Sequence, residues 1–199
     1  MLTIAIQAGG ESRRMGQDKA LMPFLGQPLI QRVVTRVAPI ADEIIVTTNH
    51  PADYAFLGLP LFSDIHPGRG PLGGLFTALS SARQPLVAVV ACDMPFVSPN
   101  LLAFQARLLE AVAADVVIPF PKEVYEPLHA VYRRESCLPV VEWALANAQW
   151  KLIAWLSKVK VRTLTTEECR KYDSAGLAFA NINTPQELAE SEELAGRTG

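Results

Sequence analysis

Apolar runs alternate with segments of helical spacing through about the first 120 residues of the chain. Residues 2–7 (LTIAIQ) and 86–91 (LVAVVA) are almost uniformly apolar. This pattern is typical of parallel strands that are covered by helices on both faces. Shorter apolar runs at residues 43–48 and 61–63 predict two more strands.

Helices are predicted between these strands. Pro28 suits a first helical turn, and Ile30, Val33 and Val37 recur at helical spacing before Pro39. A glycine- and proline-rich loop precedes a second predicted helix at about residues 72–82, and Ser98 with Pro99 begins a third that extends to about residue 112.

The second half of the chain continues with a less regular pattern. Strands are predicted at residues 116–118, 128–132 and 159–164, and helices at 136–146 and 150–156. Thr184 and Glu187 have the spacing of a capping box, with Pro185 at the first helical position, so a last helix is predicted from Pro185 to about Leu194. Trp143, Trp150 and Trp155 are expected to pack in the core or against helices.

Strands that alternate with helices indicate βαβ units, right-handed crossovers and a mostly parallel sheet with helices on both faces. We therefore expect an α/β fold: one Rossmann-like, three-layer domain over residues 1–199. Ligands of such sheets bind beyond the carboxyl ends of the strands. Four segments meet this condition, namely residues 7–19, 47–49, 64–74 and 92–94.

Composition excludes several classes of function. The 199 residues include 50% hydrophobic and 19% charged residues with a net charge of −2, which is typical of a soluble globular protein. A near-neutral chain lacks the basic face that nucleic-acid binding needs, so no nucleic-acid partner is expected. The chain has neither a basic leader nor an apolar run of the ~20 residues that span a membrane.

The three cysteines, Cys92, Cys137 and Cys169, form no C-x-x-C pair. An odd number of cysteines without a secretion signal suits a reducing compartment. We therefore expect a cytoplasmic protein that does not associate with membranes.

The strongest chemical signal directly follows the first predicted strand, in the sequence AGGESRRMGQDK at residues 8–19. Glycines let main-chain N–H groups approach a phosphate, and Arg13, Arg14 and Lys19 can neutralise several phosphate oxygens. The segment is not a Walker A loop, because Lys19 follows Gly16 by three positions and Ala20 replaces the magnesium-binding hydroxyl. The pattern favours a triphosphate site.

Asp93 directly follows the apolar run at residues 86–91 and Cys92. A carboxylate at this position needs a partner. It could open a loop by accepting main-chain N–H groups, or it could hold Mg²⁺, a hard cation that takes carboxylate and phosphate oxygens.

A literal G-x-G-x-x-G occurs at residues 68–73, with Asp93 twenty positions beyond its last glycine. On its own this pattern would indicate a nicotinamide-dependent oxidoreductase. Against that interpretation, the motif follows the third predicted strand and Pro71 removes a main-chain donor inside the turn. The three histidines have no metal-binding spacing, and no nucleophilic triad is indicated.

The sequence AGGESRRMGQDKAL at residues 8–21 resembles the signature of the molybdenum cofactor guanylyltransferases. Later motifs of that family also match in order: GPLGG at 70–74, CDMP at 92–95, EPLHAVY at 126–132 and NINTP at 181–185. The resemblance therefore spans nearly the whole chain. It implies a fold of the nucleotide-diphospho-sugar transferase type, with the nucleotide bound by the N-terminal half and the acceptor by the C-terminal half.

The activity implied by the resemblance is transfer of GMP from GTP to molybdopterin or molybdenum-bound molybdopterin, with release of pyrophosphate. Mg²⁺ is the implied cofactor, and proteins that insert molybdenum or accept the finished cofactor are implied partners. Arg14, Lys19 and Asp93 would be catalytic, and Asp93 would hold the metal. The implied binding residues are Gln7, Ala8, Gly9, Gly10, Lys19, Asp64, Asp93, Asn181 and Asn183.

Two positions depart from the family pattern. Gln7 stands where the family usually has leucine, and Thr47 stands where some members have an asparagine that contacts GTP. Transfer of CMP, transfer of a nucleotide to a sugar phosphate, and non-catalytic binding of GTP therefore remain alternatives alongside the nicotinamide-dependent oxidoreductase.

Overall fold

A computed structural model describes residues 1–9 and 18–198 of the protein. Its centre is a seven-stranded sheet with the order β5-β4-β1-β6-β8-β7-β9. The strands are β1 (Leu2–Gln7), β4 (Glu43–Thr47), β5 (Leu61–Phe62), β6 (Leu86–Ala91), β7 (Val116–Pro119), β8 (His129–Arg133) and β9 (Val161–Leu164). All neighbouring strands pair in parallel except β8, which is antiparallel to both β6 and β7. The mostly parallel sheet predicted from the sequence is confirmed.

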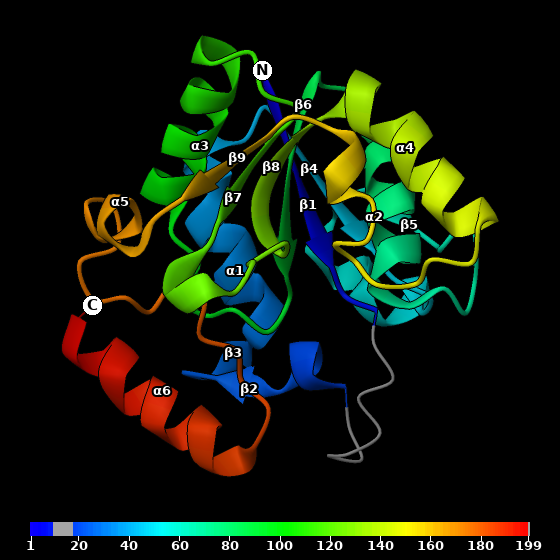
Figure 1. Ribbon diagram of the computed structural model, residues 1–199. Helices are drawn as coiled ribbons and strands as arrows, with labels where there is room; N and C mark the ends of the chain where they lie inside the picture. Colours follow the sequence, from blue (N-terminus) through cyan, green and yellow to red (C-terminus); the bar gives the residue numbers. More distant parts are fainter. Residues whose placement is uncertain (10–17, 199) are drawn as a thin grey trace.

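Helices cover both faces of this sheet, which gives three layers (Figure 1). They are α1 (Leu29–Val37), α2 (Gly70–Ser81), α3 (Pro99–Ala111), α4 (Arg134–Ala146), α5 (Thr166–Arg170) and α6 (Pro185–Thr198). Helices α1 and α3 pack on one face, where Ile4 and Ile6 of β1 contribute to the core. Helices α2 and α4 pack on the other face, which receives Ala5 of the same strand.

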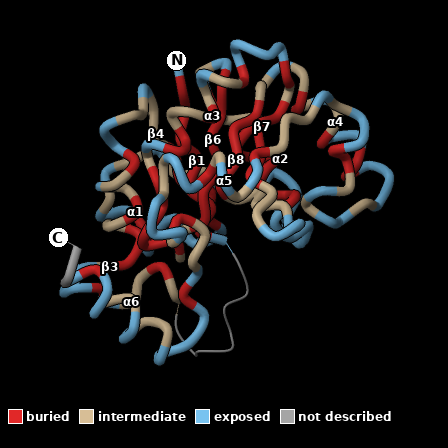
Figure 2. The backbone as a smooth tube through the Cα atoms, turned by 60° about the vertical axis from the view of Figure 1, so that its left-hand side comes forward, coloured by how far each residue is buried: buried red, intermediate tan, exposed pale blue. Residues whose placement is uncertain are grey.

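The central strands are buried along their whole length, as Figure 2 shows by colour. Every residue of β1 and of β6 is buried. Because parallel strands in the middle of a three-layer fold contact helices on both faces, an uninterrupted apolar sequence is what this position requires. None of the described helices has both the length and the apolar character needed to cross a bilayer.

Short elements that the sequence pattern did not predict lie around the sheet. They include the two-stranded pair β2 (Pro23–Phe24) and β3 (Gln27–Pro28), the 3₁₀ helices η2 (Lys19–Leu21) and η4 (Pro51–Leu57), and α5. Helix α6 packs beside β2 and β3 (Figure 1), where Phe24, Ile182 and Ala195 share a small apolar cluster. The chain after β9 therefore returns to the segment that follows β1.

The helix predicted at residues 150–156 is wrong. Turns occupy this segment, followed by the 3₁₀ helix η6 (Leu156–Lys158). A seven-residue segment has few intrahelical bonds to offset helix nucleation. The turns instead bury Trp155, whose indole N–H donates to the carbonyl of Leu152 at 2.8 Å. Trp155 is therefore a core residue, whereas Trp143 and Trp150 are 39% and 43% exposed.

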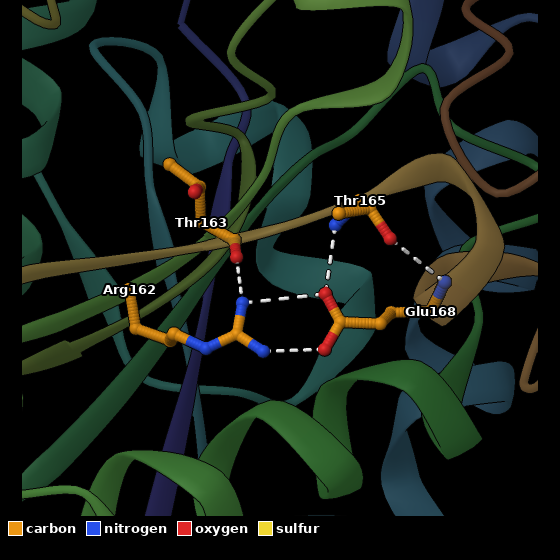
Figure 3. A network of polar contacts seen from close by, with 4 residues as sticks. All are labelled: Arg162, Thr163, Thr165 and Glu168. Carbon is orange, nitrogen blue, oxygen red and sulfur yellow. Dashed lines mark hydrogen bonds and ion pairs between the residues drawn. The ribbon is translucent and has the colours of Figure 1, made fainter.

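The sheet edge at β9 is fixed by a polar network, shown in Figure 3. The Arg162 guanidinium binds the carboxylate of Glu168 and the carbonyl of Thr163. Glu168 also accepts from the main-chain N–H of Thr165, whose hydroxyl caps α5 in return. This capping box satisfies main-chain donors at the start of α5, directly after β9.

Candidate functional site

The carboxyl ends of three central strands meet at one edge of the sheet. The register places Gln7 of β1 between Thr47 of β4 and Ala91 of β6. Two further main-chain bonds extend the ladder beyond the strands: the Ala8 N–H donates to Thr47 O at 2.8 Å, and the Cys92 N–H donates to Gln7 O at 3.1 Å. The residues that leave these strands therefore start from fixed positions.

Lys19 lies in η2, which is held by a buried tyrosine. Asp18 caps η2 by accepting from the Ala20 N–H at 3.1 Å, and its other carboxylate oxygen accepts from the Tyr54 hydroxyl at 2.6 Å. The Lys19 Nζ donates to Oδ1 of Asn183 at 2.8 Å. The structure thus joins a residue of the predicted phosphate segment to a residue of the NINTP motif.

Asp93 follows β6 on the same side of the molecule. Burial raises the pKa of the Asp93 carboxyl, and the charge of the Lys19 ammonium acts in the opposite direction. The main-chain oxygen of Asp93 accepts from the Ile182 N–H at 3.1 Å. Residues 181–183 are therefore fastened beside Asp93, which brings Lys19, Asp93 and Asn183 into one cluster.

Asp64 follows β5 and pairs with an asparagine that the sequence analysis did not select. The Asn49 Nδ2 donates to Oδ2 of Asp64 at 2.9 Å, and the Asp64 N–H donates to Oδ1 of Asn49 at 3.1 Å. Asn49 is exposed just beyond β4, whereas Thr47 is buried within the strand. In the sequence, Asn49 belongs to the segment 47–49 expected at the ligand edge, but no feature of the residue distinguished it within that segment.

A family model described as the MobA-like NTP transferase domain matches residues 4–161. The chain belongs to this MobA-like nucleotidyltransferase family. The resemblance found in the sequence motifs is confirmed.

Similar proteins agree with this assignment. The chain is 39% identical to a probable molybdenum cofactor guanylyltransferase of Carboxydothermus hydrogenoformans, covering 97% of this chain and 94% of the relative. It is 36% identical to the molybdenum cofactor guanylyltransferase of Desulfosudis oleivorans, and the match covers 96% of this chain and 94% of that relative. The crystal structure of molybdopterin-guanine dinucleotide biosynthesis protein A from Archaeoglobus fulgidus superposes on this chain with a TM-score of 0.85 at 29% identity. The match covers 98% of this chain and 99% of that protein.

The same fold occurs in nucleotidyltransferases with other substrates. A CMP:2-keto-3-deoxy-manno-octonic acid synthetase complexed with CTP has a TM-score of 0.71 at 16% identity, covering 100% of this chain and 99% of the synthetase. This likeness concerns the fold alone. It confirms the expected fold type of the MobA-like chain.

The structure describes some of the predicted site residues but not all of them. Gly10 and Arg14 lie outside the described residues. Gly9 and Asn181 are exposed, and Ala8 is buried with its N–H already bonded. The roles given to all these residues remain predictions.

The metal expected in this family can be compared with the side chains present. Within residues 1–9 and 18–198, no group of three histidine, cysteine, aspartate or glutamate side chains could hold a metal ion by itself. Mg²⁺ usually takes one or two carboxylates and completes its shell with water and substrate phosphates. Asp93 at the end of β6, beside a lysine that suits phosphates, fits that donor set.

Proposed function

We propose that this nucleotidyltransferase transfers GMP from GTP to the terminal phosphate of molybdopterin or molybdenum-bound molybdopterin and releases pyrophosphate. The observation that carries the proposal is the cluster of Lys19, Asp93 and Asn183 at the carboxyl end of β6, in a chain that belongs to the MobA-like nucleotidyltransferase family. Relatives with 36% and 39% identity over nearly the full chain are named as guanylyltransferases of the molybdenum cofactor.

The proposed reaction is an in-line displacement at phosphorus. An oxygen of the acceptor's terminal phosphate forms a bond to the α-phosphorus of GTP, and the bond from that phosphorus to the oxygen bridging to the β-phosphorus breaks. Its electron pair leaves with pyrophosphate. Such a transfer depends on positioning and on charge stabilisation, so it needs no nucleophilic side chain of the protein.

Lys19 and Arg14 are the groups proposed to stabilise the leaving pyrophosphate. The Asp18 cap and the Tyr54 hydroxyl hold η2, so the Lys19 side chain extends from a fixed main chain. Asp93 is proposed to hold Mg²⁺, which when bound would neutralise charge on the reacting phosphates. Gln7, Ala8, Gly9, Gly10 and Asp64 are proposed to line the nucleotide site.

The acceptor is proposed to bind on the side of Asn181 and Asn183. These residues flank Ile182, whose N–H is bonded to Asp93, so an acceptor bound there lies next to the reacting phosphate. The C-terminal half of the proposed single domain would thus serve acceptor binding. Proteins that insert molybdenum or use the finished cofactor are the proposed protein partners.

The cellular location is proposed to be the cytoplasm. All three cysteines are free thiols, with Cys137 and Cys169 buried in the core. A reducing compartment keeps such thiols from oxidising.

The alternatives are less well supported. CMP transfer and sugar-phosphate activation are supported only by structural neighbours that share the fold. The glycine motif at residues 68–73 leads into α2 after the edge strand β5, unlike a nicotinamide site at the first strand.

Calorimetric titration of GTP, CTP and NAD⁺ with and without Mg²⁺ tests the proposed function. We expect GTP to bind most tightly, and more tightly with Mg²⁺, and we expect pyrophosphate release only when molybdopterin is added. Preference for CTP would assign the chain to cytidylyl transfer, and binding of NAD⁺ alone would overturn the proposal.

A further inference from the structure

The Gln7 carboxamide carries a buried donor without a partner. Gln7 is 7% exposed, and its Nε2 is buried with no hydrogen-bond acceptor within reach in the described part of the chain. Buried polar atoms almost always have a partner, so such an atom calls for an explanation. Its position at the carboxyl end of β1 is where ligands of this fold bind.

The carboxamide is held in place by a glycine. A Cβ built on Gly74 would lie 3.0 Å from Oε1, 3.1 Å from Cδ and 3.3 Å from Nε2 of Gln7. The amide group therefore lies directly against the Cα of Gly74 in α2. A larger residue at position 74 would push the amide away. The position of the Gln7 side chain therefore depends on the glycine in α2.

The main chain at this point is already engaged. The Gln7 carbonyl accepts from Cys92, and the Ala8 N–H donates to Thr47. The Gln7 side chain therefore offers a free donor at this strand end.

The Gln7 amide and Ala20, the residue next to Lys19, pack on opposite faces of the sheet. Ala20, next to Lys19, packs in the core cluster of α1 and α3, whereas the Gln7 amide contacts α2 on the other face. In the proposed binding mode, the triphosphate lies at Lys19 and the nucleoside lies toward the Gln7 amide beside α2. A phosphate forms its strongest hydrogen bonds with cationic donors. The neutral amide of Gln7 is therefore better suited to the carbonyl oxygen of a base.

We infer that the Gln7 Nε2 donates to the exocyclic carbonyl oxygen of a purine base, O6 of guanine, and so contributes to base selectivity. This inference rests on the proposed function. It assigns to the side chain a contact that a leucine at this position could not make.

Three nucleotides test the contact by calorimetry: GTP, ITP and 2-aminopurine riboside triphosphate, which lacks the 6-oxygen. We expect Gln7→Leu to weaken the binding of GTP and ITP about tenfold, which is the effect of one lost hydrogen bond. The affinity for the 2-aminopurine nucleotide should stay unchanged. Gly74→Ala, which displaces the amide, should show the same pattern with a smaller change. Combined with Gln7→Leu it should add nothing further.

Gln105→Leu is the matched control. The Gln105 Nε2 donates to the carbonyls of Val117 and His129, away from the strand end. This variant should lower the melting temperature without altering the ratio of the three affinities, whereas Gln7→Leu should not lower the melting temperature.

The inference would be overturned if Gln7→Leu weakened the binding of all three nucleotides equally, or weakened none of them. Either result would leave the proposed function intact. Failure of the unmodified protein to bind GTP would overturn both.

Discussion

The Lys19 ammonium donates to the Asn183 side-chain oxygen at 2.8 Å, although the two residues are 164 positions apart in the chain. This bond connects the proposed nucleotide side with the proposed acceptor side. If Lys19 binds the triphosphate as proposed, the phosphate would replace Asn183 as the partner of the lysine, and Asn183 would then be available to the acceptor.

Replacement of Asn183 by alanine should therefore affect the acceptor more than the nucleotide. We expect KM for molybdopterin to rise about tenfold, as for the loss of one hydrogen bond, with the Kd for GTP unchanged or lower. Steady-state kinetics together with GTP titration measure both, and Asn100→Ala, at the exposed start of α3, is the control. Weaker GTP binding with normal acceptor KM would contradict the assignment.

Lys19→Ala should remove a charge that stabilises the leaving pyrophosphate. We expect kcat/KM to fall by a factor of ~10² or more, as for other groups that stabilise developing charge. Pyrophosphate release is the measurement, with the exposed Lys151→Ala as control. Near-normal turnover would show that Lys19 has no such role.

Asp93→Asn should retain the fold and lose Mg²⁺-dependent activity, because an amide is a poor ligand for this hard cation. The amide keeps nearly the same shape, and the Asp93 main-chain bond from Ile182 is unaffected by the substitution. Circular dichroism and transfer activity across a Mg²⁺ titration measure the two effects, with exposed Asp53→Asn for comparison. An unfolded variant would indicate that Asp93 is structural.

Acid should destabilise the protein through His129. The side chain is fully buried, its Nε2 accepts from the Ser98 N–H at 3.2 Å, and burial lowers its pKa to about 4. Below pH 6.5 the unfolded chain binds a proton that the folded chain does not. The free energy of unfolding should thus fall by roughly 3 kcal/mol between pH 6.5 and pH 4.

Urea unfolding at several pH values, compared between the protein and His129→Gln, measures this contribution. The variant should lose most of the slope in that pH range even if it is less stable throughout. Exposed His50→Gln should keep the slope. An unchanged slope in His129→Gln would rule out the histidine as its source.

Local sequence determined the frame of this protein. The six-residue runs of β1 and β6 are almost uniformly apolar, a pattern that is typical of a strand between two helical layers. The family was predicted from the resemblance carried by the motif at residues 8–21 and the later motifs. The carboxyl edge of the sheet, where Asp93 follows β6, was predicted as the ligand edge because ligands of such sheets bind there.

Tertiary structure decided the contacts between distant segments. The bond from Lys19 to Asn183, the pairing of Asn49 with Asp64 and the contact of Gln7 with Gly74 each join different elements. The turns around Trp155 replaced a predicted helix because burial of one large ring outweighed weak local periodicity. Periodicity reports which face of an element is buried, but which side chains meet depends on how all the elements pack.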